Sequence, residues 1–182
     1  MPEIRIVFVH VDYARYCARK RAKAAEPINI KSDSMEEGVV LYCCVEKNDE
    51  DSPASVIENS TGEIIRRLEM IKAKRVMIYP YAHLANDLSS PETAIEILTG
   101  LENSLKDRGL EVKRAPFGWY KELETKSKGH PLSDLSITVC PVVCPTTACP
   151  TTACPENEQE CGMLCPFCHK QIEKKDAVSS IL

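Results

Sequence analysis

The uneven distribution of cysteine constrains the fold of this chain more than any other sequence feature. Seven of the ten cysteines fall in residues 140–182. The other three are Cys17, Cys43 and Cys44. Of the ten aromatic residues, only Phe167 lies in that last segment. A chain of about 140 residues buries roughly two-thirds of its unfolded surface, which is enough to fold alone. We therefore expect a folded domain over residues 1–138 and a Cys/Pro-rich tail over residues 139–182, which needs a metal or a partner to become ordered.

Composition and charge exclude several classes of protein. Hydrophobic residues make up 43% of the chain and charged residues 27%, as in ordinary globular domains. No apolar run approaches the roughly 20 residues of a membrane span, so we expect no membrane association. The net charge of −4 argues against a protein that coats nucleic acid non-specifically. We see no secretory signal and expect a cytoplasmic protein, whose reducing surroundings favour metal ligation or free thiols over disulfides.

Hydrophobic periodicity predicts a mixed α/β fold for the first domain. Helical spacing of apolar residues follows Ser-Pro pairs at Pro53 and at Pro91, and proline suits the first turn of a helix. Gly109 suits the C-cap of the second helix. Strands are predicted over 4–9, 38–46, 75–79, 110–112 and 119–126, and helices over 53–72 and 91–108. Helices that alternate with strands predict a layered sheet with the helices packed on one face.

Polar side chains follow two of the predicted strands. His10 and Asp12 come after the first strand, and the segment 80–83, ending in His83, comes after the third. In open α/β sheets, ligands bind beyond the carboxyl ends of strands. The alternative interpretation is that these residues are polar only because loops are exposed to water.

The fifth predicted strand places a lysine on its apolar face. Side chains alternate along a strand, so Lys121 shares one face with Trp119 and Leu123. Burial disfavours the charged amine and lowers its pKa, which makes a lysine useful as a base or proton shuttle. The alternative is a lysine at a sheet edge that extends its ammonium group into water.

Three longer segments resemble a known family. The segments YPYAHLAND (79–87), APFGWYK (115–121) and KGHPLSDLS (128–136) closely resemble the N-terminal editing domain of archaeal-type threonyl-tRNA synthetase, and the resemblance extends over residues 1 to about 138. It implies a D-aminoacyl-tRNA deacylase-like fold, which is a mixed sheet with helices on one face, and a homodimer. It also implies hydrolysis of the ester of L-seryl-tRNA(Thr), because a pocket for threonine cannot exclude the smaller serine and one methylene is worth only about 1–3 kcal/mol.

The resemblance also implies roles for individual residues. Lys121 and His83 correspond to the catalytic residues, with help from the ribose hydroxyl next to the ester. Tyr120 and Asp134 are implied to hold the lysine and the terminal adenosine, although the family often has glutamate where Asp134 is one methylene shorter. The other residues implied to bind the substrate are Pro80, Tyr81, Ala82, Pro116, Phe117, Gly118 and His130. No cofactor is needed for this chemistry.

The sequence carries no signature of an ATP site and leaves no room for an aminoacylation core. We therefore expect a deacylase without ligase activity, which acts on the acceptor end of tRNA(Thr) beside a separate threonyl-tRNA synthetase. The alternative is a catalytically inactive editing fold that serves as a binding module, with the tail docking a partner or sensing metal. The presence of Lys121, His83 and Tyr120 together favours the enzyme.

A run of basic residues over positions 15–23, with no acidic residue inside it, has two interpretations. It either contacts tRNA phosphates, which supply much of the affinity of such complexes, or forms a solvated protein face. The residues are Arg15, Arg19, Lys20, Arg21 and Lys23.

The cysteines of the tail suggest a metal site. Cys165-Pro-Phe-Cys168 resembles the knuckle of a zinc ribbon, in which two thiolates on a tight turn reach one ion. We expect zinc, with the second pair of ligands supplied by Cys154 and Cys161 or by Cys149 and Cys154. A flexible thiol-rich tail, an iron–sulfur cluster and haem ligation are the alternatives.

Overall fold

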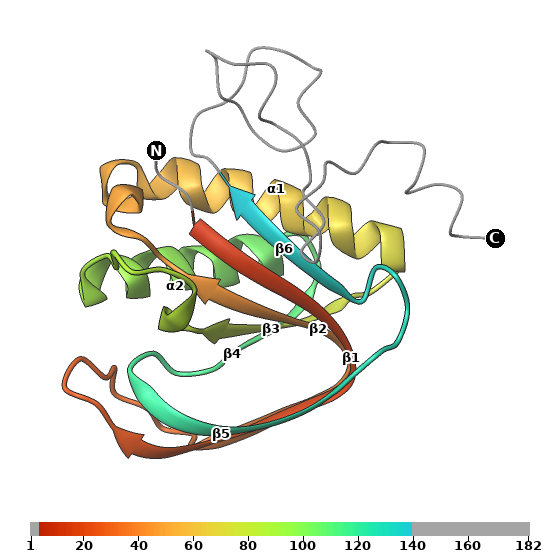
Figure 1. Cartoon of the computed structure of the whole chain (residues 1–182), viewed down its shortest axis with the longest axis horizontal. Helices are drawn as coiled ribbons and strands as arrows, with labels where there is room; N and C mark the ends of the chain where they lie inside the picture. Colours follow the sequence, from red (N-terminus) through yellow and green to blue (C-terminus); the bar gives the residue numbers. More distant parts are fainter. Residues whose placement is uncertain (1–3, 140–182) are drawn as a thin grey trace.

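The computed structural model describes residues 4–139, which form a mixed sheet with two α-helices (Figure 1). The strands are β1 Ile4–Arg21, β2 Ser32–Cys44, β3 Arg75–Pro80, β4 Glu111–Arg114, β5 Trp119–Ser127 and β6 Asp134–Val139. The α-helices are α1 Pro53–Ile71 and α2 Pro91–Asp107, and short 3-10 helices cover Lys47–Asp51 and Ala82–Leu84. Neither α-helix of this region is long and apolar enough to cross a membrane.

Both helices lie where the sequence predicts them. Pro53 and Pro91 occupy their first turns, and the hydroxyl of Ser90 accepts a hydrogen bond from the Thr93 amide at 3.3 Å. Gly109 follows α2 with φ of 81°, a conformation that glycine adopts without steric cost. The apolar faces of both helices pack on the same side of the sheet, so this prediction is confirmed.

The strand order is β4-β3-β2-β1-β5, and β6 pairs with the first part of β1. The strands β2, β3 and β4 are parallel and are connected through α1 and α2. The strand β1 runs antiparallel to β2, β5 and β6, so the sheet is mixed as predicted. The carboxyl ends of β2 and β3 therefore lie next to each other at one edge.

The strand β1 has 18 residues, about three times the length of a mean strand, and it bends, whereas the sequence predicts a strand that ends at residue 9. A register shift between Val11 and Tyr13 marks an irregularity of the β-bulge kind, which bends a strand and displaces its alternation by one residue. Before the bend Val9 and Val11 face one side, and after it Ala14 and Tyr16 face the same side. The alternation of buried and exposed residues changes phase there, which is why the sequence pattern does not predict one continuous strand over residues 4–21.

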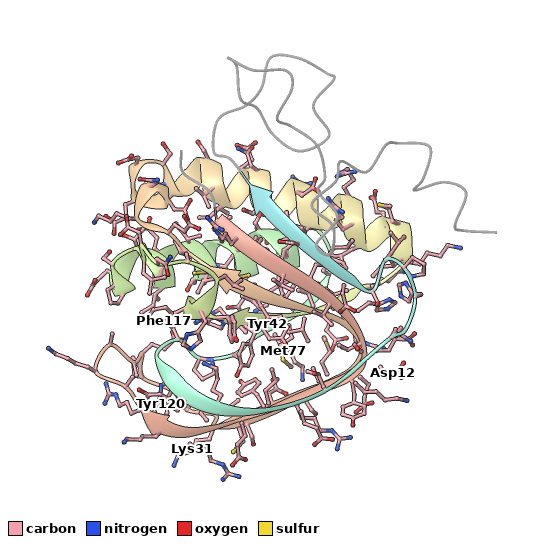
Figure 2. The ribbon with its side chains drawn as sticks, in the orientation of Figure 1. Asp12, Lys31, Tyr42, Met77, Phe117 and Tyr120 are labelled. Atoms are coloured by element: carbon pink, nitrogen blue, oxygen red, sulfur yellow. The ribbon has the colours of Figure 1, made fainter. Side chains whose placement is uncertain are left out.

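The bend produces a second apolar core. The returning half of β1 and its partner β5 curve over the face of β2 and β3 that the helices leave open (Figure 1). The buried residues of this core are Val11, Ala14, Tyr16, Met35, Val40, Met77, Tyr79 and Ala115. In Figure 2, Tyr42 and Met77 lie between the two layers, with Asp12 at the bend and Phe117 and Tyr120 at the other end.

The sequence-based prediction misses β6, and it starts the second strand at residue 38 instead of 32. In β6, Leu135, Ile137 and Val139 alternate with polar residues, so the period-2 signal of a strand is present in the sequence and the prediction overlooks it. In β2, exposed polar residues precede Gly38. Gly38 lies where an added Cβ would come within 2.6 Å of the Arg75 carbonyl, so a close approach of β3 requires glycine there.

Candidate active site

A cavity of about 510 Å³ lies at the edge where β2 and β3 end and β5 begins. The end of β2 contributes Cys43 and Cys44, and α2 closes one side with residues such as Leu98. The segment after β3 and the start of β5 supply most of the polar groups. The predicted residues that line the cavity are Pro80, Tyr81, Ala82, His83, Phe117, Gly118, Tyr120 and Lys121.

The Lys121 side chain points into the molecule, as the alternation along β5 predicts, since Trp119, Lys121 and Leu123 are all partly buried. Its amine donates hydrogen bonds to the carbonyl oxygens of Pro116 and Trp119, each at 2.9 Å. The same nitrogen lies 4.9 Å from the centroid of the Tyr79 ring. The amine is therefore held at a defined position instead of extending into solvent.

Burial lowers the pKa of Lys121 to about 8, because the charged ammonium group loses hydration. The negative charge of Glu26 opposes this effect and raises the pKa. At pH 7 roughly a tenth of the Lys121 amines are then neutral, far more than for a lysine in water. A neutral amine can accept a proton, so the site contains a base that works near neutral pH.

Three tyrosine rings connect Lys121 with His83. Tyr79 packs edge-on against Tyr42, and Tyr42 packs edge-on against Tyr81, each with centroids 5.5 Å apart. Tyr81 in turn contacts the His83 ring at 5.3 Å. Burial raises the pKa of Tyr79 to about 12, so that ring is a neutral wall at physiological pH. The two predicted catalytic side chains thus belong to one packed aromatic unit.

Tyr120 is 64% exposed and lies on the opposite face of β5 from Lys121, although it lines the cavity at its rim. The Lys121 amine binds backbone carbonyls, so the implied contact of Tyr120 with the lysine is absent from the bonds described for residues 4–139. Pro116 does not line this cavity and contributes its carbonyl to Lys121 instead.

Asp134 and His130 lie elsewhere. Asp134 begins β6 opposite Val9, and its carboxylate accepts a hydrogen bond from the Ser133 hydroxyl at 3.1 Å. His130 Nε2 lies 2.8 Å from Nδ1 of His10. Neither residue lines the cavity around Lys121. The negative charge of Asp134 nevertheless acts on Tyr42, which packs against Tyr79 and Tyr81. The implied contacts of Asp134 and His130 with substrate stay predictions.

A second polar cluster surrounds the bend of β1. His10 is buried at 8% exposure, and its ring meets His130. The Leu132 amide donates to His130 Nδ1 at 3.3 Å, so the His130 proton resides on Nε2 and is donated to His10. Asp12 pairs with Lys126 and Lys128 at 3.0 and 2.9 Å. The prediction that His10 and Asp12 lie at a strand end is wrong, because β1 continues past both.

Cys43 and Cys44 are cavity residues that the sequence does not predict. Both are 2% exposed, and burial raises the pKa of each thiol. The two thiols therefore stay protonated, line the cavity as uncharged groups, and do not act as nucleophiles. They follow the buried part of β2, and the rule for strand ends that pointed to His83 could have found them.

Within residues 4–139, no group of three or more His, Cys, Asp or Glu side chains is arranged to hold a metal ion. The predicted zinc ligands Cys154, Cys161, Cys165 and Cys168 lie outside the described residues.

Solved structures establish the class of fold. A probable eukaryotic D-amino acid tRNA deacylase superposes with a TM-score of 0.59 over 75% of this chain and 100% of its own, at 12% identity. The c-Myc DNA Unwinding Element Binding Protein superposes with a TM-score of 0.54 over 73% and 97%, at 11% identity. At such identities the likeness establishes the fold alone, which is the predicted D-aminoacyl-tRNA deacylase-like fold.

Sequence comparisons establish the family. A family model of the archaea-specific editing domain of threonyl-tRNA synthetase matches residues 4–139. The threonine–tRNA ligase of Methanococcus aeolicus is 44% identical over 133 residues, which are 73% of this chain and 21% of that protein. The threonine–tRNA ligase of Methanopyrus kandleri is 45% identical over 139 residues, or 76% and 22%. The chain belongs to this editing-domain family, and it spans about a fifth of the length of these relatives.

Membership of this family supports a role in tRNA editing.

Proposed function

We propose that this domain hydrolyses the ester of L-seryl-tRNA(Thr), spares L-threonyl-tRNA(Thr), and acts without an aminoacylation core in the same chain. The observation that carries the proposal is the Lys121 amine, which is held by two carbonyls in the wall of a cavity and has a pKa of about 8. Membership of an editing-domain family supplies the class of substrate.

The proposed chemistry assigns Lys121 to the attacking water. An aminoacyl ester is already activated, so the enzyme mainly has to orient water and stabilise the charge that develops on the ester oxygen. The neutral amine accepts a proton from that water, and the ammonium form then lies beside the developing negative charge. Burial keeps both forms accessible near neutral pH, because it lowers the pKa of Lys121 to about 8.

His83 and the terminal ribose complete the proposal. His83 lies in the short helix that follows β3, and its ring packs against Tyr81 at the cavity wall. We assign it to the ribose, where it holds a hydroxyl or shares the transfer of a proton. Since the adjacent ribose hydroxyl also helps to activate water, loss of His83 should remove only part of the rate enhancement.

We place the tRNA strand across the end of β1. Lys20 and Lys23 are exposed there, and Lys20 lies opposite Tyr120 in the pairing of β1 with β5. Arg15 and Arg19 lie further from the rim and pair with Glu36 and Glu122. We therefore assign phosphate contacts to the two lysines. Removal of either contact should reduce the slope of log K for tRNA binding against log salt concentration by about one.

The experiment that tests the function compares deacylation of Ser-tRNA(Thr) and Thr-tRNA(Thr) by the full chain, with no synthetase added. We expect rapid hydrolysis of the seryl ester and little hydrolysis of the threonyl ester. Equal hydrolysis of both would contradict the proposed specificity. If neither ester is hydrolysed, the enzyme proposal is wrong and the inactive binding module is favoured.

The remaining partners are proposed from the family resemblance. We propose that the chain forms a homodimer and edits the product of a separate threonyl-tRNA synthetase. Light scattering at micromolar concentration should give twice the mass of 20.3 kDa. A monomeric mass would contradict the dimer, and ATP–pyrophosphate exchange with threonine would contradict the absence of ligase activity.

A further inference from the structure

The loop that follows β1 is attached to the loop that precedes β5. The Ala22 amide donates to the Gly118 carbonyl at 2.9 Å, and the Glu26 amide donates to the Phe117 carbonyl at 3.3 Å. Gly118 has φ of 70°, and a Cβ at this position would come within 2.6 Å of the Ala25 Cα. The two loops therefore touch at the level of the backbone, and this contact requires glycine.

Glu26 makes most of the side-chain bonds between these loops. Its carboxylate accepts two hydrogen bonds from the Arg114 guanidinium, at 2.7 and 3.0 Å, and a third from the Phe117 amide at 2.6 Å. Its carbonyl accepts the indole N–H of Trp119 at 2.9 Å. The Glu26 side chain is 13% exposed, so water competes little for these bonds.

Arg114 is fixed from its other side as well. Its Nε donates to Glu102 of α2 at 2.9 Å, and its side chain is only 16% exposed. The planar guanidinium therefore connects α2 to Glu26, with little freedom to rotate. Glu26 is held by the folded body of the domain and not only by a neighbouring loop.

The bonds of Glu26 enclose the two carbonyls that hold Lys121. Phe117 follows Pro116 directly, and Trp119 is itself bonded to Glu26 through its ring. We propose that Glu26 is a positioning residue of this site, which through Arg114 and the Phe117 amide keeps the Pro116 and Trp119 carbonyls where they hold the Lys121 amine. This inference rests on the proposed function for its role in deacylation, but the positioning itself does not depend on the reaction.

The charge of Glu26 adds a second effect. Burial lowers the pKa of Lys121, and the carboxylate of Glu26 raises it. Removal of the charge without a change of shape should therefore lower the pKa of Lys121 further. A shorter side chain at position 26 that keeps the charge should loosen the loop and leave the pKa of Lys121 almost unchanged.

Two variants separate these effects, and a third is a matched control. Glu26→Gln keeps the reach of the side chain and removes its charge, whereas Glu26→Asp keeps the charge and shortens the side chain by one methylene. Glu102→Gln removes the charge of the other acidic partner of Arg114 but keeps an oxygen that can accept the Arg114 Nε–H, so the anchor on α2 is retained. The Glu102 side chain is 18% exposed against 13% for Glu26, and none of its bonds described for residues 4–139 reaches the loop before β5.

The direct measurement is the pH dependence of Lys121 acetylation by trace acetic anhydride in the full chain, read by mass spectrometry. We expect Glu26→Gln to lower the midpoint, so that the neutral fraction of Lys121 at pH 7 rises roughly threefold for a shift of half a pH unit. Glu26→Asp and Glu102→Gln should leave the midpoint in place. If Glu26→Gln leaves it in place too, or Glu102→Gln shifts it equally, the inference is wrong.

Deacylation kinetics supply the second measurement, with circular dichroism to check that each variant folds. Glu26→Asp should lower kcat for the seryl ester about tenfold with little change in KM, because the amine is displaced and substrate binding is not. Glu102→Gln should retain kcat. Wild-type kcat in Glu26→Asp would overturn the positioning role. If the wild-type protein hydrolyses neither ester while the midpoint still shifts in Glu26→Gln, the function fails and the inference on Glu26 stands.

Discussion

Two lysines at opposite ends of β5 show what surroundings do to one residue type. Lys121 near its start is partly buried, bonds to two carbonyls, and has a pKa of about 8. Lys128, just after its end, pairs with Asp12 and Glu37, and these two carboxylates raise its pKa. Both amines are ordered, but only one is easily deprotonated near neutral pH.

The comparison teaches that order alone does not make a lysine chemically useful. Carbonyl oxygens hold the Lys121 amine in place without the full charge that would stabilise its protonated form, whereas carboxylates do both at Lys128. The histidines divide in the same way. His83 packs at the wall of the cavity, whereas His130 is engaged by His10 at the bend. The following predictions test this division.

The largest effect is expected from Lys121→Met. Loss of one group that transfers a proton typically costs 10²–10⁴ in rate, so deacylation of the seryl ester should fall by roughly this factor. Lys128→Met at the other end of β5 should retain nearly full activity. The measurement is single-turnover deacylation of Ser-tRNA(Thr). Full activity in Lys121→Met would contradict the mechanism but not the function.

His83→Ala should reduce the rate of deacylation less than Lys121→Met, because the ribose hydroxyl also helps to activate the attacking water. The matched change at the bend is His130→Gln, which keeps a polar side chain and lies outside the cavity. We expect it to leave kcat unaltered. A strong loss of kcat in His130→Gln would restore the substrate contact that the family resemblance implies and that the geometry does not support.

Lys121→Met should also stabilise the domain at pH 7. The folded-state pKa of about 8 lies below the value of 10.5 for an unperturbed lysine, so folding opposes protonation of this amine. The stabilisation by the substitution should be largest below pH 8 and should disappear as the pH rises past 10. Thermal unfolding at several pH values measures it. Equal Tm values for wild type and variant at pH 7 would indicate that burial does not penalise this amine.

At the bend, stability should fall as the pH decreases below about 6.5. Burial is the main cause of the lowered pKa of His10, with smaller contributions from His130 and Lys128, whereas Glu37 and Asp12 oppose it. Because the folded-state pKa lies below the unfolded value of 6.5, stability is complete above that value and is lost as His10 is protonated. His10→Gln should flatten this part of the curve.

Asp12→Asn provides the contrast within the same cluster. Hydrogen bonds from Lys128 and Lys126 lower the pKa of Asp12 to about 2. Its contribution is present above the unfolded value of 3.8 and is lost as the pH falls toward 2. Asp12→Asn should therefore lower stability by a constant amount above about pH 4 and by progressively less toward pH 2, so that the slope of the stability curve differs from wild type only below about pH 4. A difference in slope between pH 5 and 7 would show that the two groups titrate together.

The smallest effect on the folded domain is expected from removal of metal. We propose near-stoichiometric zinc in the full chain, bound by Cys154, Cys161, Cys165 and Cys168. Elemental analysis of freshly purified, reduced protein tests this, and a metal-free result would contradict it. Chelation should leave the circular dichroism of residues 4–139 unchanged, because two apolar cores there supply the stability.

Much of the fold follows from local pattern. Both helices, β3 and β5 are signalled by periodicity, and the helix starts by proline as well. The strand β1 is not, because the irregularity after Val11 displaces its alternation. The strand β6 does carry a local signal, because Leu135, Ile137 and Val139 alternate with polar residues, but the prediction overlooks it.

The candidate site divides along the same line. The sequence by itself determined that Lys121 faces inward with Trp119 and Leu123, and that His83 follows the end of a strand, because each statement depends only on the geometry of one element. Only the tertiary structure decided that His130 binds His10, and that Glu26 encloses the carbonyls that hold Lys121. These partners lie 120 and 91 residues apart in the chain, and no local pattern encodes such a contact. The bend of β1 brings them together, since it carries Glu26 back to the start of β5.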